Sequence, residues 1–175
     1  MDKIIHESGA NFGPFKDKDL FHIEKSTTYN ILGEGVKTVE FICARNDRKS
    51  FVLVEAKKTC PNERNREESP TNFEKYDDYY ASIVQKVEDS LQILVATLLE
   101  RFKFDEGVGE NLRKIRIANA DFKFVLVLTS LDVKKDWLAG PKAELERRLL
   151  RLRKIWGLKV IVMNQEMAKR LRLVC

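Results

Sequence analysis

The fold of this chain is decided by the stretch Ser50-Phe51-Val52-Leu53-Val54-Glu55-Ala56-Lys57-Lys58. Its apolar residues predict a buried β-strand, and the strand ends in a Glu-x-Lys pair. Side chains alternate across a strand, so two sets face opposite sides of the sheet: Phe51, Leu53, Glu55 and Lys57 on one side, and Val52, Val54 and Ala56 on the other. A carboxylate and an ammonium therefore emerge on the same face, where an apolar strand meets solvent.

A second strand is predicted directly upstream, at residues 37–44. It carries an acid, Glu40, among apolar residues, and a polar turn at residues 45–49 joins it to the first strand, which is typical of a hairpin. Glu40 and Glu55 are therefore expected on neighbouring strands. Two carboxylates and a lysine at one place can hold a divalent metal and activate a water molecule, which outlines a metal-dependent nuclease site.

The remaining pattern predicts further strands and helices. Apolar residues at spacings of three and four predict a long helix from a capping box at residues 71–74 to about Phe102. A strand, a helix, a strand and a short basic helix capped by Asn164 should follow, at residues 122–128, 141–156, 158–163 and 165–171. Strand–helix–strand stretches imply parallel crossovers, so the predicted fold class is α/β (α+β), a mixed central β-sheet flanked by helices.

The length of 175 residues fits a single domain. We expect an irregular N-terminal arm (1–18), a nuclease-like core (19–130) and a basic helix and strand extension (131–175). Whether residues 19–31 form a helix or a strand stays open. The chain shows no membrane-helix or signal-peptide pattern, and its three cysteines suggest neither a disulfide framework nor a zinc site. These features favour a cytoplasmic protein that does not contact a membrane.

Basic residues are concentrated from Lys134 onward, although the net charge is only +5. Such clustering is typical of a nucleic-acid-binding surface. A solvated helix face gives the same pattern, and charge alone favours that simpler explanation. Five residues are expected to contact phosphates: Lys58, Arg147, Arg148, Arg151 and Lys154.

Glu40, the hairpin, the Glu55-Ala56-Lys57 triplet and the long helix together resemble the core of the PD-(D/E)xK nuclease superfamily, which includes restriction endonucleases, junction resolvases and repair nucleases. The resemblance covers residues 20–130 and implies an α-β-β-β-α-β, restriction-endonuclease-like core. It implies that Mg²⁺ or Mn²⁺ is held by Glu40, Glu55 and the Ala56 carbonyl. Lys57 would orient the attacking water or stabilise charge on the phosphate, and Glu24 is the candidate for an additional acid. The expected substrate is DNA, with RNA left open.

The triplet alone is a weak signal, because three other acid-x-lysine triplets occur at residues 47–49, 121–123 and 132–134. Only Glu55-Ala56-Lys57 closes an apolar strand directly after another acid-bearing strand. Two alternatives stay open besides a plain surface ion pair. One is a catalytically inactive nucleic-acid binder with the same fold, and the other is a protein-interaction module that acts with a partner protein or as a homo-oligomer. The two histidines, His6 and His22, show no spacing to carboxylates that suggests a metal site.

Overall fold

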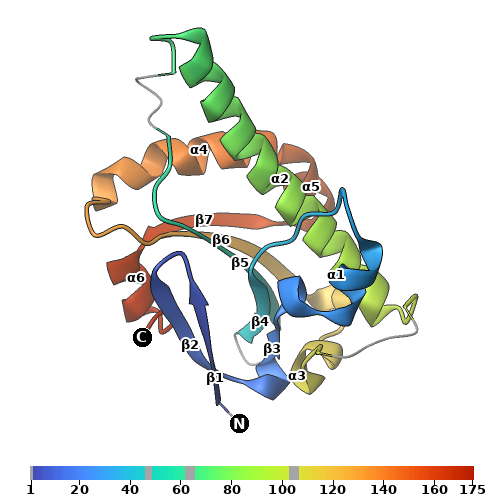
Figure 1. Ribbon diagram of the computed structural model, residues 1–175. Helices are drawn as coiled ribbons and strands as arrows, with labels where there is room; N and C mark the ends of the chain where they lie inside the picture. The colour runs from blue at the N-terminus through green and yellow to red at the C-terminus, as the bar shows by residue number, and fades with distance from the viewer. Residues whose placement is uncertain (1, 46–48, 62–65, 103–106) are drawn as a thin grey trace.

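Five strands form one mixed sheet in the computed structural model, which describes residues 2–45, 49–61, 66–102 and 107–175 (Figure 1). The strands stand in the order β3 (Leu20–Phe21), β4 (Phe41–Arg45), β5 (Ser50–Lys57), β6 (Asp121–Leu128) and β7 (Lys159–Asn164). β3, β4 and β5 pair antiparallel, whereas β5, β6 and β7 pair parallel. The predicted mixed α/β sheet is therefore confirmed. Most of the turn expected between β4 and β5 lies outside the described residues.

The central strand β5 is buried, as its sequence predicts, and its side chains alternate between two cores. Leu53 packs in the core under the long helix α2 (Pro70–Leu98). Val52 and Val54 pack in the core on the opposite face of the sheet. Glu55 has the parity of Leu53, so it points toward α2.

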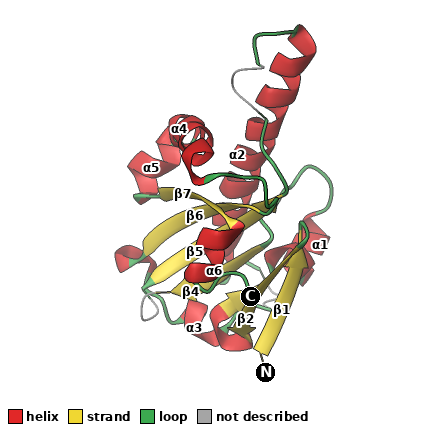
Figure 2. Cartoon of the chain, turned by 90° about the vertical axis from the view of Figure 1, so that its left-hand side faces the viewer, coloured by secondary structure: helices red, strands yellow, loops and turns green. Residues whose placement is uncertain are grey.

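Helices cover one face of the sheet, and a hairpin with a short helix covers the other (Figure 2). The first face carries α2, α4 (Ala139–Arg148) and α5 (Leu150–Trp156). The second carries the β1 (Asp2–Glu7) and β2 (Ala10–Lys16) hairpin and α6 (Gln165–Arg170). The shorter elements are η1 (Asp17–Asp19), η2 (Ile23–Lys25), α1 (Thr27–Leu32), α3 (Glu110–Arg113), η4 (Ile117–Asn119) and η5 (Lys135–Leu138). Residues 19–31, which the sequence leaves open, thus contribute both strand and helix.

The expectation of an irregular N-terminal arm is wrong. β1 and β2 pair antiparallel, and Ile5 and Phe12 are buried against the sheet. Gly13 and Pro14 interrupt the apolar alternation of β2, which conceals the strand in the sequence. The hairpin is held by the far end of the chain, since the Gly13 N–H donates to the Leu173 carbonyl at 2.9 Å.

Helix starts follow the capping chemistry of the sequence. α2 begins one residue before the expected capping box, because Ser69 accepts a hydrogen bond from the Asn72 N–H at 3.2 Å and Pro70 occupies the first turn. α6 begins as predicted, with the Asn164 side chain accepting from the Met167 N–H at 3.0 Å. No helix in the described part of the chain has the length and apolar character needed to cross a membrane.

α2 ends at Leu98 and not near Phe102 as expected. Glu100 adopts a left-handed conformation with φ of 56°. The Arg101 N–H then donates to the Ala96 carbonyl at 2.9 Å, the closing bond of a Schellman motif. This C-cap stops the helix although the apolar pattern continues.

The single helix expected at residues 141–156 is divided into α4 and α5 at Leu149. The Arg153 guanidinium donates to the Glu146 carbonyl at 3.3 Å. In a continuous helix that carbonyl would accept from Leu150, so the arginine replaces one bond of the ladder. Leu149, at the division, is buried in the core between these helices and the sheet.

Candidate active site

The two predicted acids face each other at the carboxyl end of β5. Phe41 pairs with Val54, and the Glu40 N–H donates to the Val54 carbonyl at 3.1 Å. Glu40 therefore stands opposite Glu55, one step beyond the last paired residues. Cross-strand neighbours in an antiparallel pair have Cβ atoms about 4.5–5.5 Å apart. Both carboxylates point to the face that α2 covers.

Glu40 lies just before β4, because the strand begins at Phe41 and not at residue 37 as expected. Upstream of it, the Lys37 N–H donates to the Asp89 carboxylate at 3.0 Å and the Val39 N–H donates to the Ser90 hydroxyl at 2.9 Å. Side chains of α2 thus satisfy backbone groups that a strand ladder would otherwise use. The same bonds fix Glu40 against α2.

Two lysines bind Glu55. Lys57 Nζ lies 2.9 Å from Glu55 Oε1, as the sequence led us to expect. Lys86 of α2 donates to both oxygens of Glu55, at 2.9 and 3.1 Å, and its Nζ lies 3.9 Å from Glu40 Oε1. Lys86 was missed from the sequence, although it shares a helix face with the buried Ile83 and Ser90, where a lysine is unusual.

The centre is nearly closed to solvent. The Glu55 side chain has no exposed surface, whereas 34% of the Lys57 side chain is exposed. The pKa of Glu40 is raised to about 8, chiefly by burial and then by the nearby Glu55 carboxylate, while Lys86 opposes the shift. Burial alone would lower the pKa of Lys86, but the hydrogen bonds and charge of Glu55, together with the charges of Glu40 and Glu24, raise it. The raised pKa of Lys86 favours its ammonium form, whereas the raised pKa of Glu40 favours its neutral, protonated form.

The Ala56 carbonyl, expected to be a further metal ligand, already has a hydrogen-bond partner. The Ser8 hydroxyl, from the turn between β1 and β2, donates to it at 3.0 Å. The Ser8 carbonyl in turn accepts from the Thr129 hydroxyl at 2.5 Å. A carbonyl oxygen has two lone pairs, so Ala56 retains capacity for a second partner. The hairpin turn therefore forms one wall of the site.

Glu24, the candidate additional acid, lies in η2 beside Glu7 and His22. One ligand atom from each of these three residues lies within 4.8 Å of the other two. Burial raises the pKa of Glu7, and Glu24 adds to the effect; burial lowers the pKa of His22, and Lys25 adds to the effect. The sequence spacing of the histidines gives no sign of this cluster. The hairpin brings Glu7 to it, and the hairpin was not foreseen.

Two of the five residues expected to contact phosphates bind acids of the protein instead. Arg148 donates to the carboxylates of Glu144 and Asp77, both at 2.6 Å, and only 15% of its side chain is exposed. Arg147 is exposed but is also bound to Glu144, at 2.6 Å. Arg148 thus joins α4 to α2 and is a structural residue.

The other three, Lys58, Arg151 and Lys154, are exposed. Lys58 follows β5 directly, next to the acidic centre. Arg151 lines a cavity of about 790 Å³ between α2 and α5, together with Leu152 and Trp156. These three side chains remain available for phosphate contacts.

Comparisons with known proteins identify no relative: no family model matches the chain, and no curated protein or solved structure is significantly similar to it. The resemblance to PD-(D/E)xK nucleases therefore has no support beyond the residues themselves.

The residues of the centre fit a divalent cation. Four carboxylates share this end of the sheet with two ammonium groups: Glu7, Glu24, Glu40 and Glu55 with Lys57 and Lys86. The Lys86 ammonium already bridges Glu55 and Glu40, so a positive charge at this place is favourable. Carboxylate and carbonyl oxygens are the ligands that Mg²⁺ prefers.

Proposed function

We propose that the protein is a metal-dependent nuclease of the PD-(D/E)xK kind, which hydrolyses phosphodiester bonds of nucleic acid, with DNA as its substrate. One observation carries the proposal. Glu40, directly before β4, stands opposite Glu55 of the neighbouring strand β5, and Lys57 Nζ lies 2.9 Å from Glu55. An acidic pair with an adjacent ammonium at a sheet end suits phosphodiester hydrolysis.

Glu40, Glu55 and the Ala56 carbonyl would hold Mg²⁺ or Mn²⁺. The bound ion would acidify water and offset charge on the phosphate. Lys57 is the more exposed of the two lysines, so it can contact the attacking water or a phosphate oxygen. Lys86 holds the Glu55 carboxylate in place in the absence of a cation and limits repulsion between the two acids.

The bond from Lys86 to both oxygens of Glu55 also favours a second candidate function. A lysine that saturates the acid gives a stable buried ion pair that needs no metal. The protein would then be a catalytically inactive nucleic-acid-binding or protein-interaction module with the same fold.

Cleavage assays separate these functions. We expect the purified chain to cleave circular DNA, linear DNA or RNA in Mg²⁺ or Mn²⁺ and not in chelator. Lys57→Ala and Glu55→Gln should lower the rate by about 100-fold or more, since each removes charge stabilisation at the phosphate. The matched control is Lys159→Ala, which removes an exposed lysine paired with Asp121 on the surface.

If chelator or the Lys57→Ala substitution left the cleavage rate unchanged, the proposal of a metal-dependent nuclease with this site would be wrong. Salt-dependent nucleic-acid binding without hydrolysis, unchanged by Glu55→Gln, would support the inactive binder. A stable oligomer in light scattering, with no nucleic-acid binding, would support the interaction module.

A further inference from the structure

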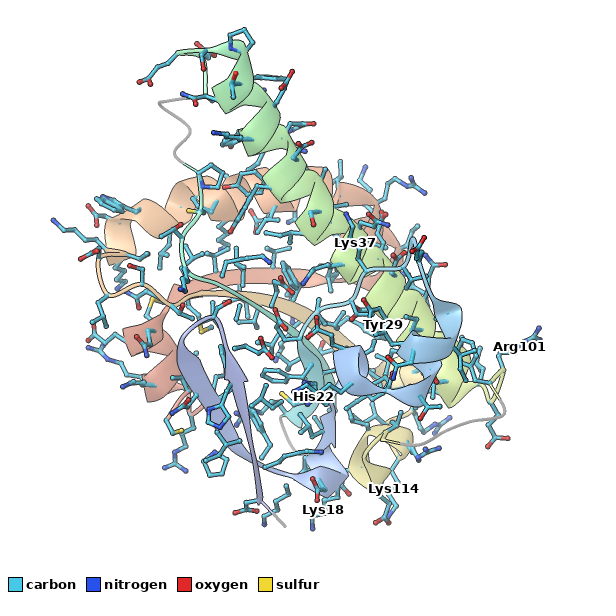
Figure 3. All side chains as sticks on the ribbon, viewed as in Figure 1. Lys18, His22, Tyr29, Lys37, Arg101 and Lys114 are labelled. Carbon is cyan, nitrogen blue, oxygen red and sulfur yellow. The ribbon has the colours of Figure 1, made fainter. Side chains whose placement is uncertain are left out.

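A second group of metal-ligating side chains lies beside the acidic pair. Glu7 ends β1, His22 follows β3 and Glu24 lies in η2, so two separate parts of the chain meet here. One ligand atom from each residue lies within 4.8 Å of the others, and all three side chains are half-buried. Figure 3 shows His22 in the space between the hairpin and α1.

The imidazole of His22 supplies an independent observation. Its Nε2 atom is buried and has no hydrogen-bond partner in the described part of the chain. Buried polar atoms in folded proteins are nearly always satisfied, and an orphaned one points to a missing water or ion. The other histidine differs, because His6 is exposed and its Nδ1 lies 2.7 Å from the Asn11 side-chain oxygen.

We propose that Glu7, His22 and Glu24 form a second cation site, separate from the Glu40–Glu55 pair, that binds a divalent transition-metal ion such as Zn²⁺ or Mn²⁺. One imidazole nitrogen with two carboxylate oxygens suits these ions, whereas Mg²⁺ selects oxygen ligands. Zn²⁺ binds its ligands at about 2.0–2.2 Å, so the side chains must close by on the order of 1 Å. Three half-buried side chains have room for such a movement.

The surroundings allow an ion to enter and give it a role. His22 lines a cavity of about 400 Å³ with Lys3, Lys25 and His6, all three of which are exposed, although His6 stands outside the Glu7–His22–Glu24 cluster. Solvent screens these two ammonium groups, so they oppose a bound cation only weakly. The ion would offset repulsion between Glu7 and Glu24 and would join the hairpin to the sheet. The site does not depend on the proposed nuclease activity.

The test is a titration of the full chain with Co²⁺, a visible-absorbing substitute for Zn²⁺, in the presence of excess Mg²⁺. Excess Mg²⁺ competes for any site made of oxygen ligands alone, including the Glu40–Glu55 pair, and leaves the nitrogen-containing site for Co²⁺. We expect one equivalent of Co²⁺ to bind, and Zn²⁺ to displace it. Zn²⁺ should also raise the melting temperature, because it binds the folded state.

His22→Asn and Glu7→Gln should each weaken Co²⁺ binding by more than about tenfold. His6→Asn is the matched control and should bind as the wild type does. Glu7 is half-exposed at the end of a surface hairpin, so Glu7→Gln tests the site even if His22→Asn fails to fold. Absent Co²⁺ binding in the wild type, binding unchanged in both variants, or loss in His6→Asn would overturn the proposal. Glu55→Gln cleavage assays report on the nuclease site alone, so the two proposals can fail separately.

Discussion

Glu55 is a carboxylate without exposed surface, and its energy depends on the two ammonium groups that contact it. Removing one partner of a buried ion pair leaves an uncompensated charge in the protein interior, where the dielectric constant is low. Lys86 contacts both oxygens from inside the protein, whereas Lys57 contacts one oxygen from the solvent side. The two lysines should therefore differ in their effect on stability and on catalysis.

Lys86→Met should lower the free energy of unfolding by about 3 kcal/mol, because it leaves Glu55 with one partner. Lys57→Met should cost about 1 kcal/mol or less, since the pair is partly solvated and Lys86 remains. Urea denaturation measures both, and the double variant Glu55→Gln/Lys86→Met should recover part of the loss. Equal costs for the two lysines would contradict this assignment.

Because of Glu40, the free energy of unfolding should fall as pH rises. The pKa of Glu40 is raised from 4.5 to about 8 in the folded protein, first by burial and then by Glu55. Between these values the folded state keeps a proton that the unfolded state has released. The stability that the proton confers is full below the unfolded pKa and is lost as pH rises through the folded value.

Glu40→Gln imitates the protonated acid, so its stability relative to the wild type should grow from about pH 5 to about pH 9. Urea denaturation at several pH values measures the difference. Glu55→Gln serves as a comparison, because it deprives both lysines of their partner and should destabilise throughout. A difference that shrinks with pH would show that Glu40 is ionised in the folded protein.

The end of α2 stores backbone strain in one residue. Glu100 is in the left-handed region, where side chains other than glycine are disfavoured. Glu100→Gly should therefore stabilise the protein by about 0.5–1 kcal/mol in chemical denaturation. Glu100→Ala retains a Cβ and should bring no such gain. A loss of stability in the glycine variant would mean that the glutamate side chain contributes more than the strain costs.

Local chemistry explains which elements could be predicted from the sequence. β5, β6 and the body of α2 carry long apolar patterns, and Asn164 is a strong capping residue, so these elements were foreseen. The β1–β2 hairpin was missed because Gly13 and Pro14 interrupt the apolar alternation of β2 and because the hairpin depends on residues 173–175 for support.

The same distinction applies to the site. Glu55 and Lys57 lie on β5 and Glu40 directly precedes β4, its neighbour in the sequence, so their proximity follows from the pairing of the two strands. Lys86 lies in α2 and Glu7 in β1, and both elements pack on the sheet although they are distant in sequence from Glu40 and Glu55. Only tertiary structure brings them there, and no sequence spacing reports it.

At the scale of the whole molecule, the basic residues of α4 and α5 divide into structural and exposed groups. Arg151→Ala/Lys154→Ala should weaken nucleic-acid binding and lower the slope of log affinity against log salt by about 0.9 for each phosphate that is no longer neutralised. Fluorescence anisotropy at several salt concentrations measures this slope, and stability should hardly change. Arg148→Ala is the contrasting control, because it breaks the α2–α4 connection and should lower stability instead. An unchanged salt slope would place the nucleic-acid surface elsewhere.

The hairpin that forms one wall of the site is fastened by residues about 160 positions further along the chain. The Cys175 N–H donates to the Asn11 carbonyl at 2.9 Å, and Phe12 forms an isolated antiparallel β-bridge with Val174. Ribosomes add about 5–20 residues per second, so the hairpin waits on the order of ten seconds for these partners during synthesis. Glu7 and Ser8 can settle only afterwards. A growing chain would therefore lack this wall of the Glu40–Glu55 site until residues 173–175 have been made.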